Sequence, residues 1–252
     1  MKYVKILKDG LPIWGSLKGN EIKLLKNPPF EKTEYTGESV AFSGAKLLAP
    51  CEASKVVAIG KNYFDHVSEM KEEMPENPII FLKPATAIIN PGDDIIYPKA
   101  SERVDYEGEL ALIIKKRAYK VKRGNAAEYI LGYTCLNDVT ARDIQKREGQ
   151  WDRAKGYDTF APLGPIVTNE AEPYPLEIET RLNGAVKQKA STSLQMWKIP
   201  ELIEFITDGM TLLPGDVVTT GTPSGIGPMQ PGDTVEIDIP GVGILKNTII
   251  KE

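Results

Sequence analysis

The sequence predicts a β-rich α+β protein whose main domain is a mixed β-sandwich or roll of sheets. Short apolar runs with β-like composition outnumber helical patterns. Pro-Gly-Asp occurs at residues 91–93, 214–216 and 231–233, each time before a β-rich run, and this tripeptide is typical of corners and hairpins. Few helices are expected, so a parallel doubly wound sheet is disfavoured.

A small β subdomain is expected at residues 1–50, followed by the main domain at residues 51–252. Runs at residues 3–7, 12–17 and 21–25, separated by Asp-Gly and Gly-Asn, predict an antiparallel meander. The proline- and glycine-containing stretch that follows is typical of a connection.

In the main domain, residues 55–59 predict a buried strand that leads into a polar helix or mobile cover ending before Pro75. Residues 79–83 predict another strand. Helices are expected at residues 126–129, 141–148 and 199–208, the last with Pro200 in its first turn.

Composition excludes several classes of function. The 252 residues carry a net charge of −4 with a pI near 5.4, which gives no basic footprint for nucleic acid or an anionic membrane. No run resembles a signal peptide or a transmembrane helix, so a cytoplasmic protein is expected. Cys51 and Cys135 are too few for a disulfide framework or a zinc site.

The chain has one histidine, His66, and Glu69 follows it by three residues. Histidine exchanges protons near neutral pH. On a helix these two residues are neighbours, so Glu69 can orient the imidazole and stabilise its charged form. A surface histidine on a polar helix is the alternative.

Three carboxylates suggest a metal site. Glu107 and Glu109 are two apart at the start of an apolar strand, so their side chains lie on one face, and Asp138 follows another β-like run. Oxygen ligands alone favour Mg²⁺, Mn²⁺ or Ca²⁺ over zinc or copper. The alternative for the two glutamates is a solvated edge strand.

Three carboxylates and one divalent cation leave one negative charge, which would repel an anionic substrate. Arg142 and Lys155 are candidate compensating cations, because arginine grips carboxylates in a bidentate way and lysine supplies a point charge. Surface pairing with Asp143 or Asp152 is the alternative for each.

Together these residues resemble the fumarylacetoacetate hydrolase family, over roughly residues 50–252. Five stretches carry the resemblance: Gly60-Lys61-Asn62-Tyr63 with His66 and Glu69, Asp105-Tyr106-Glu107-Gly108-Glu109-Leu110, Asn137-Asp138-Val139-Thr140-Ala141-Arg142-Asp143, Lys155-Gly156-Tyr157-Asp158-Thr159, and residues 215–227. The short N-terminal region is similar to that of compact prokaryotic members.

The resemblance implies the β-sandwich roll of the family's C-terminal domain, a homodimer, and Mg²⁺ or Mn²⁺ held by Glu107, Glu109 and Asp138. It also implies roles for further residues: catalysis by His66, Glu69 and Lys155, support of the metal site by Lys155 and Thr159, and substrate contacts from Arg142, Gln145, Tyr157 and Thr222.

The expected reaction is metal-dependent cleavage of a C–C bond in a small 2-oxo acid, such as an acylpyruvate, through an enolate, with His66 and Glu69 activating water. Oxaloacetate decarboxylation or tautomerisation, and isomerisation of the 2-hydroxyhepta-2,4-diene-1,7-dioate type, fit the same residues. A metal-stabilised β domain that binds ligands without turnover is the non-enzymatic alternative. Residues 62–78 are expected to form a lid that is mobile without substrate, which hydrogen exchange would detect.

Overall fold

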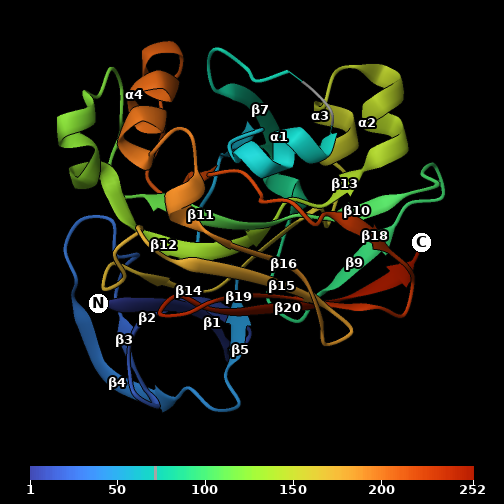
Figure 1. Ribbon diagram of the computed structural model, residues 1–252. Helices are drawn as coiled ribbons and strands as arrows, with labels where there is room; N and C mark the ends of the chain where they lie inside the picture. Colours follow the sequence, from blue (N-terminus) through green and yellow to red (C-terminus); the bar gives the residue numbers. More distant parts are fainter. Residues whose placement is uncertain (71–72) are drawn as a thin grey trace.

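The structure, a computed structural model, describes residues 1–70 and 73–252. Strands dominate this part of the chain, and most of them pair antiparallel (Figure 1). The helices α1, α2, α3 and α4 lie together on one side of the molecule, and the N-terminal strands lie on the opposite side. The β-rich α+β prediction is confirmed. None of the helices among the described residues combines the length and the apolar character that crossing a membrane requires.

The largest sheet has twelve strands. Ten of them follow the order β4-β3-β2-β1-β14-β12-β11-β17-β6-β7, while β5 pairs with β1 and β8 pairs with β14. The strands are β1 (Lys2–Lys8), β2 (Leu11–Lys18), β3 (Glu21–Leu25), β4 (Tyr35–Ala41), β5 (Lys46–Leu48), β6 (Lys55–Gly60), β7 (Ile79–Pro84), β8 (Ile88–Ile89), β11 (Gly108–Ile114), β12 (Ile130–Asn137), β14 (Ala161–Thr168) and β17 (Val217–Thr219).

Two smaller sheets complete the β structure. One has the order β13-β10-β18 and the other β16-β15-β19-β20-β9. Their strands are β9 (Asp94–Tyr97), β10 (Val104–Tyr106), β13 (Thr140–Ala141), β15 (Glu177–Leu182), β16 (Ala185–Ser191), β18 (Gly227–Met229), β19 (Thr234–Ile239) and β20 (Gly243–Lys251).

The helices expected at residues 141–148 and 199–208 are present, residues 126–129 lie in a 3-10 helix, and the short helix at residues 152–155 was not expected. The α-helices are α1 (Phe64–Met70), α2 (Arg142–Glu148), α3 (Asp152–Lys155) and α4 (Ile199–Gly209), and the 3-10 helices are η1 (Ala85–Ala87), η2 (Arg123–Tyr129) and η3 (Thr192–Leu194). Helix α4 buries Leu202, Ile203 and Ile206, which recur at helical spacing on one face.

The N-terminal meander is confirmed, because β1 pairs with β2 and β2 with β3, both antiparallel. Strand β1 also pairs with β14. The N-terminal strands therefore extend the sheet that carries part of the site.

The Pro-Gly-Asp repeats are turns held by their aspartates. Each glycine has a positive φ, and each aspartate carboxylate accepts a hydrogen bond from the backbone N–H three residues earlier, with the pairs Asp93 and Asn90, Asp216 and Leu213, and Asp233 and Gln230. The repetition is therefore structural.

The chain changes sheets between β10 and β11, at Glu107. Sequence alternation suggested a continuous strand here, whereas β10 belongs to the three-stranded sheet and β11 to the twelve-stranded sheet. Gly108 permits the crossing, because a Cβ there would lie 2.1 Å from Oγ1 of Thr180 in the third sheet. Strand β11 is central, between β12 and β17, so the edge-strand alternative for the two glutamates is wrong.

Candidate active site

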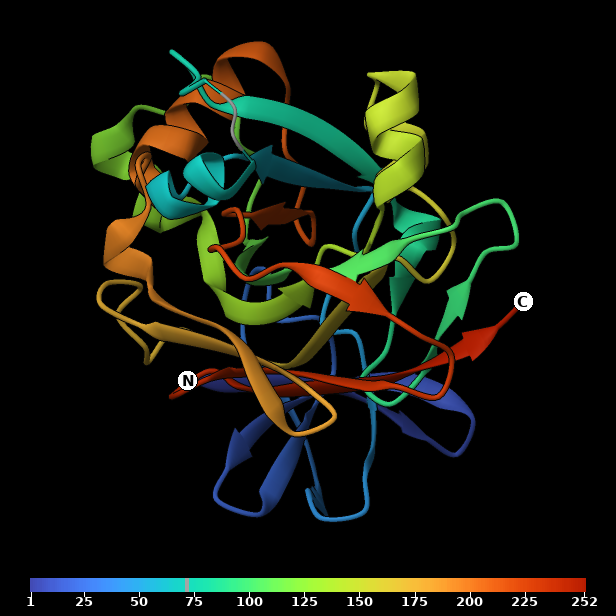
Figure 2. The same ribbon diagram turned by 45° about the vertical axis from the view of Figure 1, so that its right-hand side comes forward.

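A cavity of about 530 Å³ opens beside α1 and α2, and it contains most of the predicted site residues. Figure 2 shows α1, α2 and the loop before β18 around this region. Its lining combines charged groups with apolar ones: Ile59, Gly60, Lys61, His66, Glu69, Glu107, Glu109, Arg142, Gln145, Lys146, Trp151, Lys155 and Thr222. Asp138, buried behind the lining, and Tyr157 are not in this set.

The three predicted metal ligands come together. Glu107, Glu109 and Asp138 are buried, and each offers a carboxylate oxygen within 4.8 Å of those of the other two. They arrive from different places: the sheet crossing, the start of β11 and the turn after β12. Like charges this close repel unless cations or protons compensate them.

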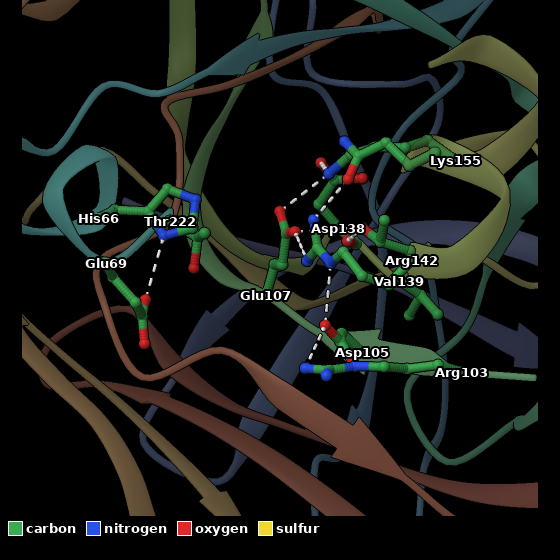
Figure 3. A network of polar contacts seen from close by, with 12 residues as sticks. His66, Glu69, Arg103, Asp105, Glu107, Asp138, Val139, Arg142, Lys155 and Thr222 are labelled. Atoms are coloured by element: carbon green, nitrogen blue, oxygen red, sulfur yellow. Dashed lines mark hydrogen bonds and ion pairs between the residues drawn. The ribbon is translucent and has the colours of Figure 1, made fainter. Parts of the chain in front are cut away.

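Lysine 155 compensates two of these carboxylates. Its Nζ donates to Oε2 of Glu107 at 2.8 Å and to Oδ2 of Asp138 at 2.6 Å (Figure 3). Burial lowers the pKa of Lys155, but Asp138 and Glu107 more than offset it, and the net pKa is raised. The surface-pairing alternative for Lys155 is therefore wrong.

A second buried lysine was not predicted from the sequence. Lys83 on β7 is fully buried, and its Nζ donates to Oδ1 of Asp138 and, at 3.2 Å, to the carbonyl of Val139. A lysine among the hydrophobic residues 79–82 was the available signal, since an ammonium in such a strand needs a buried partner.

Arginine 142 is also held by buried partners. Its Nε donates to Asp105 at 2.9 Å, one Nη to Oε1 of Gln145 at 2.6 Å, and the other to Oε1 of Glu107 (Figure 3). Burial opposes ionisation of Glu107, but Lys155 and Arg142 hold the pKa of its carboxyl well below its usual range. Asp105 was not predicted as a site residue, yet it fixes the guanidinium beside the cavity.

Glu109 forms no ion pair with a lysine or arginine among the described residues. Its Oε2 accepts a hydrogen bond from the Gly221 N–H at 2.9 Å, while its buried Oε1 has no hydrogen-bond partner among the described residues. Burial raises the pKa of Glu109 well above its usual range, and repulsion from Asp138 and Glu107 adds to the rise. The positive charge of Lys155 only partly offsets these effects, so Glu109 is the least compensated carboxylate of the three.

The donor set fits a hard divalent cation. An orphaned, buried carboxylate oxygen in a group of three carboxylates is what such an ion would satisfy, and carboxylate oxygens are the ligands that Mg²⁺ and Mn²⁺ prefer. The buried cluster holds four carboxylates, with Asp105 included, and three cations, Lys83, Arg142 and Lys155. A divalent cation would change its net charge from −1 to +1, which favours an anionic ligand.

His66 faces this cluster from α1. Its side chain is 8% exposed, and Nδ1 lies 3.5 Å from Oε2 of Glu69, too far for a strong hydrogen bond (Figure 3). Glu69 also accepts from the Gly225 N–H at 3.1 Å, which ties α1 to the loop before β18. Residues 71–72 of the expected lid lie outside the described residues, and lid mobility stays a prediction.

The remaining predicted residues occupy different positions. Thr222 lines the cavity, donates to the Gly108 carbonyl at 3.0 Å and accepts from Gln188 at 2.8 Å. The Thr159 hydroxyl accepts from the backbone N–H of Ile96 at 2.9 Å. Tyr157 packs against Phe160, with ring centroids 5.3 Å apart, rather than lining the cavity.

Comparison with known proteins decides the family. Residues 55–250 match the model described as fumarylacetoacetate hydrolase C-terminal, and residues 1–50 match one described as Rv2993c-like, N-terminal. The chain belongs to the fumarylacetoacetate hydrolase family. Members of this family are enzymes, among them isomerases, tautomerases and hydrolases.

Three family members illustrate this range. Oxaloacetate tautomerase YisK of Bacillus subtilis is 40% identical, over 83% of this chain and 74% of its own. The crystal structure of a 5-carboxymethyl-2-hydroxymuconate delta-isomerase from Mycobacterium smegmatis is 44% identical, with a TM-score of 0.94 and full coverage of both chains. Fumarylpyruvate hydrolase from Pseudomonas aeruginosa, solved with Mn²⁺ and pyruvate, is 30% identical, with a TM-score of 0.77, over 80% of this chain and 91% of its own.

The surroundings of His66 predict how kcat/KM depends on pH in the acidic range. Burial lowers the pKa of His66 below its ordinary 6.5, Arg142 lowers it further, and Glu107 and Glu69 only partly oppose them. If neutral His66 is the base, kcat/KM falls at acidic pH with a midpoint below pH 6.5. A pH profile of kcat/KM with its acidic midpoint above 6.5 would contradict this role.

Lys83 gives a stability prediction. The change Lys83→Met leaves Asp138 buried with one cation fewer, and we expect the free energy of unfolding to fall by about 3–5 kcal/mol. Urea unfolding measures this loss. Leu82→Met is the matched control, because Leu82 is 38% exposed on the same strand. Equal stability of the two variants would show that the Lys83 contact is dispensable.

Proposed function

We propose that this protein is a divalent-metal-dependent enzyme that moves protons on a small 2-oxo acid, interconverting its enol and keto forms. The observation that carries the proposal is the placement of His66, a buried histidine whose pKa is lowered, across the cavity from the carboxylate cluster. Such a histidine is neutral at physiological pH and can act as a base.

Glu107, Glu109 and Asp138 would hold the Mg²⁺ or Mn²⁺ ion. When bound, such an ion acts as a Lewis acid for the oxygens of a 2-oxo acid. Lys155 places a further positive charge beside Glu107 and Asp138, on the side of the cavity where enolate charge develops. Arg142, Gln145 and Thr222 line the same cavity, where they would contact the substrate.

In the keto-to-enol direction, His66 takes a proton from C3, the electron pair of that C–H bond forms the C2=C3 double bond, and the carbonyl π pair moves to the 2-oxygen. That oxygen then takes a proton from solvent to give the enol. Glu69, 3.5 Å from Nδ1, stabilises the imidazolium that forms. In the reverse direction the imidazolium returns the proton to C3. The hydrogen bond from the Gly225 N–H to Glu69 connects α1 to the loop before β18.

The relatives support proton transfer as the leading reaction. The tautomerase at 40% identity and the isomerase structure at 44% identity are more similar to this chain than the fumarylpyruvate hydrolase at 30%. Interconversion of enol and keto forms and isomerisation both need proton transfers and no attacking water.

Hydrolysis of an acylpyruvate is the second candidate, favoured by the hydrolase structure solved with Mn²⁺ and pyruvate. In that reaction His66 takes a proton from water, the resulting hydroxide attacks the C4 carbonyl, and the C3–C4 bond breaks with its electron pair on C3. Decarboxylation of oxaloacetate would break the corresponding bond without water. All three reactions use the same cluster.

Product analysis separates these reactions. With Mg²⁺ or Mn²⁺ present, the protein is incubated with oxaloacetate and with acetylpyruvate, and products are followed by ultraviolet absorbance and NMR. Faster interconversion of enol and keto oxaloacetate without pyruvate release supports the tautomerase. Acetate and pyruvate from acetylpyruvate would support the hydrolase instead, and pyruvate from oxaloacetate the decarboxylase.

A further inference from the structure

The cavity contains a lysine that the proposed chemistry does not use. Lys146 lies on α2, four residues after Arg142, so the two side chains share one face of the helix. Lys146 lines the cavity and is exposed, which places it at the open side. Within residues 1–70 and 73–252 it has no hydrogen bond or salt bridge.

The neighbouring Arg147 differs in each respect. It is absent from the cavity lining, and its guanidinium pairs with Glu148 at 3.2 Å and Asp143 at 3.9 Å. Two adjacent cations on α2 therefore have different surroundings: one is compensated by the protein, and the other faces the cavity.

A second lysine, Lys61, lines the cavity just after β6. Its φ of +55° lies in the left-handed region, which costs free energy for a residue with a Cβ. Such a conformation at the edge of a cavity is typical of functional positions. Both lysines therefore contribute to the lining of the cavity.

The rest of the lining fits a carbon chain. Ile59 and Trp151 provide apolar surface, and the Trp151 ring packs so closely on Gly60 that a Cβ there would lie 2.4 Å from it. Arg142 already donates to Asp105, Gln145 and Glu107, so its main hydrogen bonds are committed inside the protein. A second anionic group on a ligand would need another cation.

We propose that Lys146, assisted by Lys61, binds a second carboxylate and selects dicarboxylic 2-oxo acids over monocarboxylic ones. The inference rests on the proposed function, because it assumes that the 2-oxo acid end of the substrate lies at the carboxylate cluster. The lysine ammonium is a donor and a point charge suited to a carboxylate at the open side of a cavity.

The test measures binding separately from turnover. Calorimetry in the presence of Mg²⁺ compares the dicarboxylic acids 2-oxoglutarate and 2-oxoadipate with the monocarboxylic 2-oxobutanoate. In Lys146→Met we expect affinity for at least one dicarboxylic acid to fall about tenfold, the loss of one charge-assisted contact, with 2-oxobutanoate affinity within about twofold of the wild type.

Two further variants sharpen the test. Arg147→Met removes the same charge from the same helix outside the cavity and should leave all affinities unchanged. Lys61→Asn removes a charge while keeping a residue that tolerates positive φ, and should weaken dicarboxylate binding further in combination with Lys146→Met. Retained 2-oxobutanoate binding shows that each variant is folded.

The outcomes separate the two proposals. Equal effects of Lys146→Met and Arg147→Met, or equal losses for both ligand classes, overturn the role of Lys146. If either result is found and the wild type turns over 2-oxo acids, the proposed function stands and only the role of Lys146 is rejected. If dicarboxylate selectivity depends on Lys146 but no 2-oxo acid is turned over, the binding assignment stands and the proposed function fails. If the wild type binds none of the three acids, both fail.

Discussion

Replacing His66 with alanine is expected to lower kcat for enol and keto interconversion by about 10²- to 10⁴-fold, the usual contribution of a general base. His66 is the single histidine of the sequence, and it lines the cavity opposite the carboxylate cluster. The side chains of Glu107, Arg142 and Lys155 are anchored to one another and not to His66, so substrate binding should change little.

Steady-state kinetics with oxaloacetate measures this effect, and Asp65→Ala is the matched control. Asp65 is exposed on the same helix and does not line the cavity. Partial recovery of His66→Ala by added imidazole would further support proton transfer. A variant that keeps wild-type kcat would remove His66 from the mechanism.

Replacing Glu109 with glutamine is expected to remove most of the stabilisation that a divalent cation gives to the folded protein. Divalent cation at about one hundred times its Kd should stabilise the wild type by about 2.7 kcal/mol, or a rise in Tm of roughly 5–10 °C for a chain of this size. Glu109→Gln should lose most of that rise, because it removes the carboxylate whose buried Oε1 has no hydrogen-bond partner among the described residues.

The same variant should also raise the Tm of the metal-free protein, since it removes a buried carboxylate repelled by Asp138 and Glu107. Thermal unfolding with EDTA and then with Mg²⁺ or Mn²⁺ tests both effects. Glu102→Gln, which makes the same change at an exposed acid outside the cavity lining, is the control. A full metal-dependent Tm rise in Glu109→Gln would exclude Glu109 as a ligand.

Local sequence signals predicted much of this site. Spacing alone placed Glu107 and Glu109 together and His66 beside Glu69 on a helix, and the structure has both arrangements. The break at Glu107 was not predicted, because it depends on contact between Gly108 and Thr180 in another sheet. Sequence spacing does not encode a contact between residues 72 positions apart.

The sequence also did not predict two ion pairs between distant segments. Lys83 meets Asp138 from 55 positions away, and Asp105 meets Arg142 from 37. The hydrophobic residues 79–82 signal that Lys83 needs a buried partner, but the sequence identifies neither that partner nor the partner of Asp105. Their burial is visible only in three dimensions, since it is the tertiary structure that removes them from water.

The rate of enol-to-keto conversion of oxaloacetate tests the central claim most directly. It is followed by the ultraviolet absorbance of the enol, for the wild type with Mg²⁺ or Mn²⁺, for the same protein in EDTA, and for His66→Ala with the metal. The account predicts acceleration in the first case and near-background rates in the other two. Acceleration that survives both metal removal and the loss of His66 would contradict it.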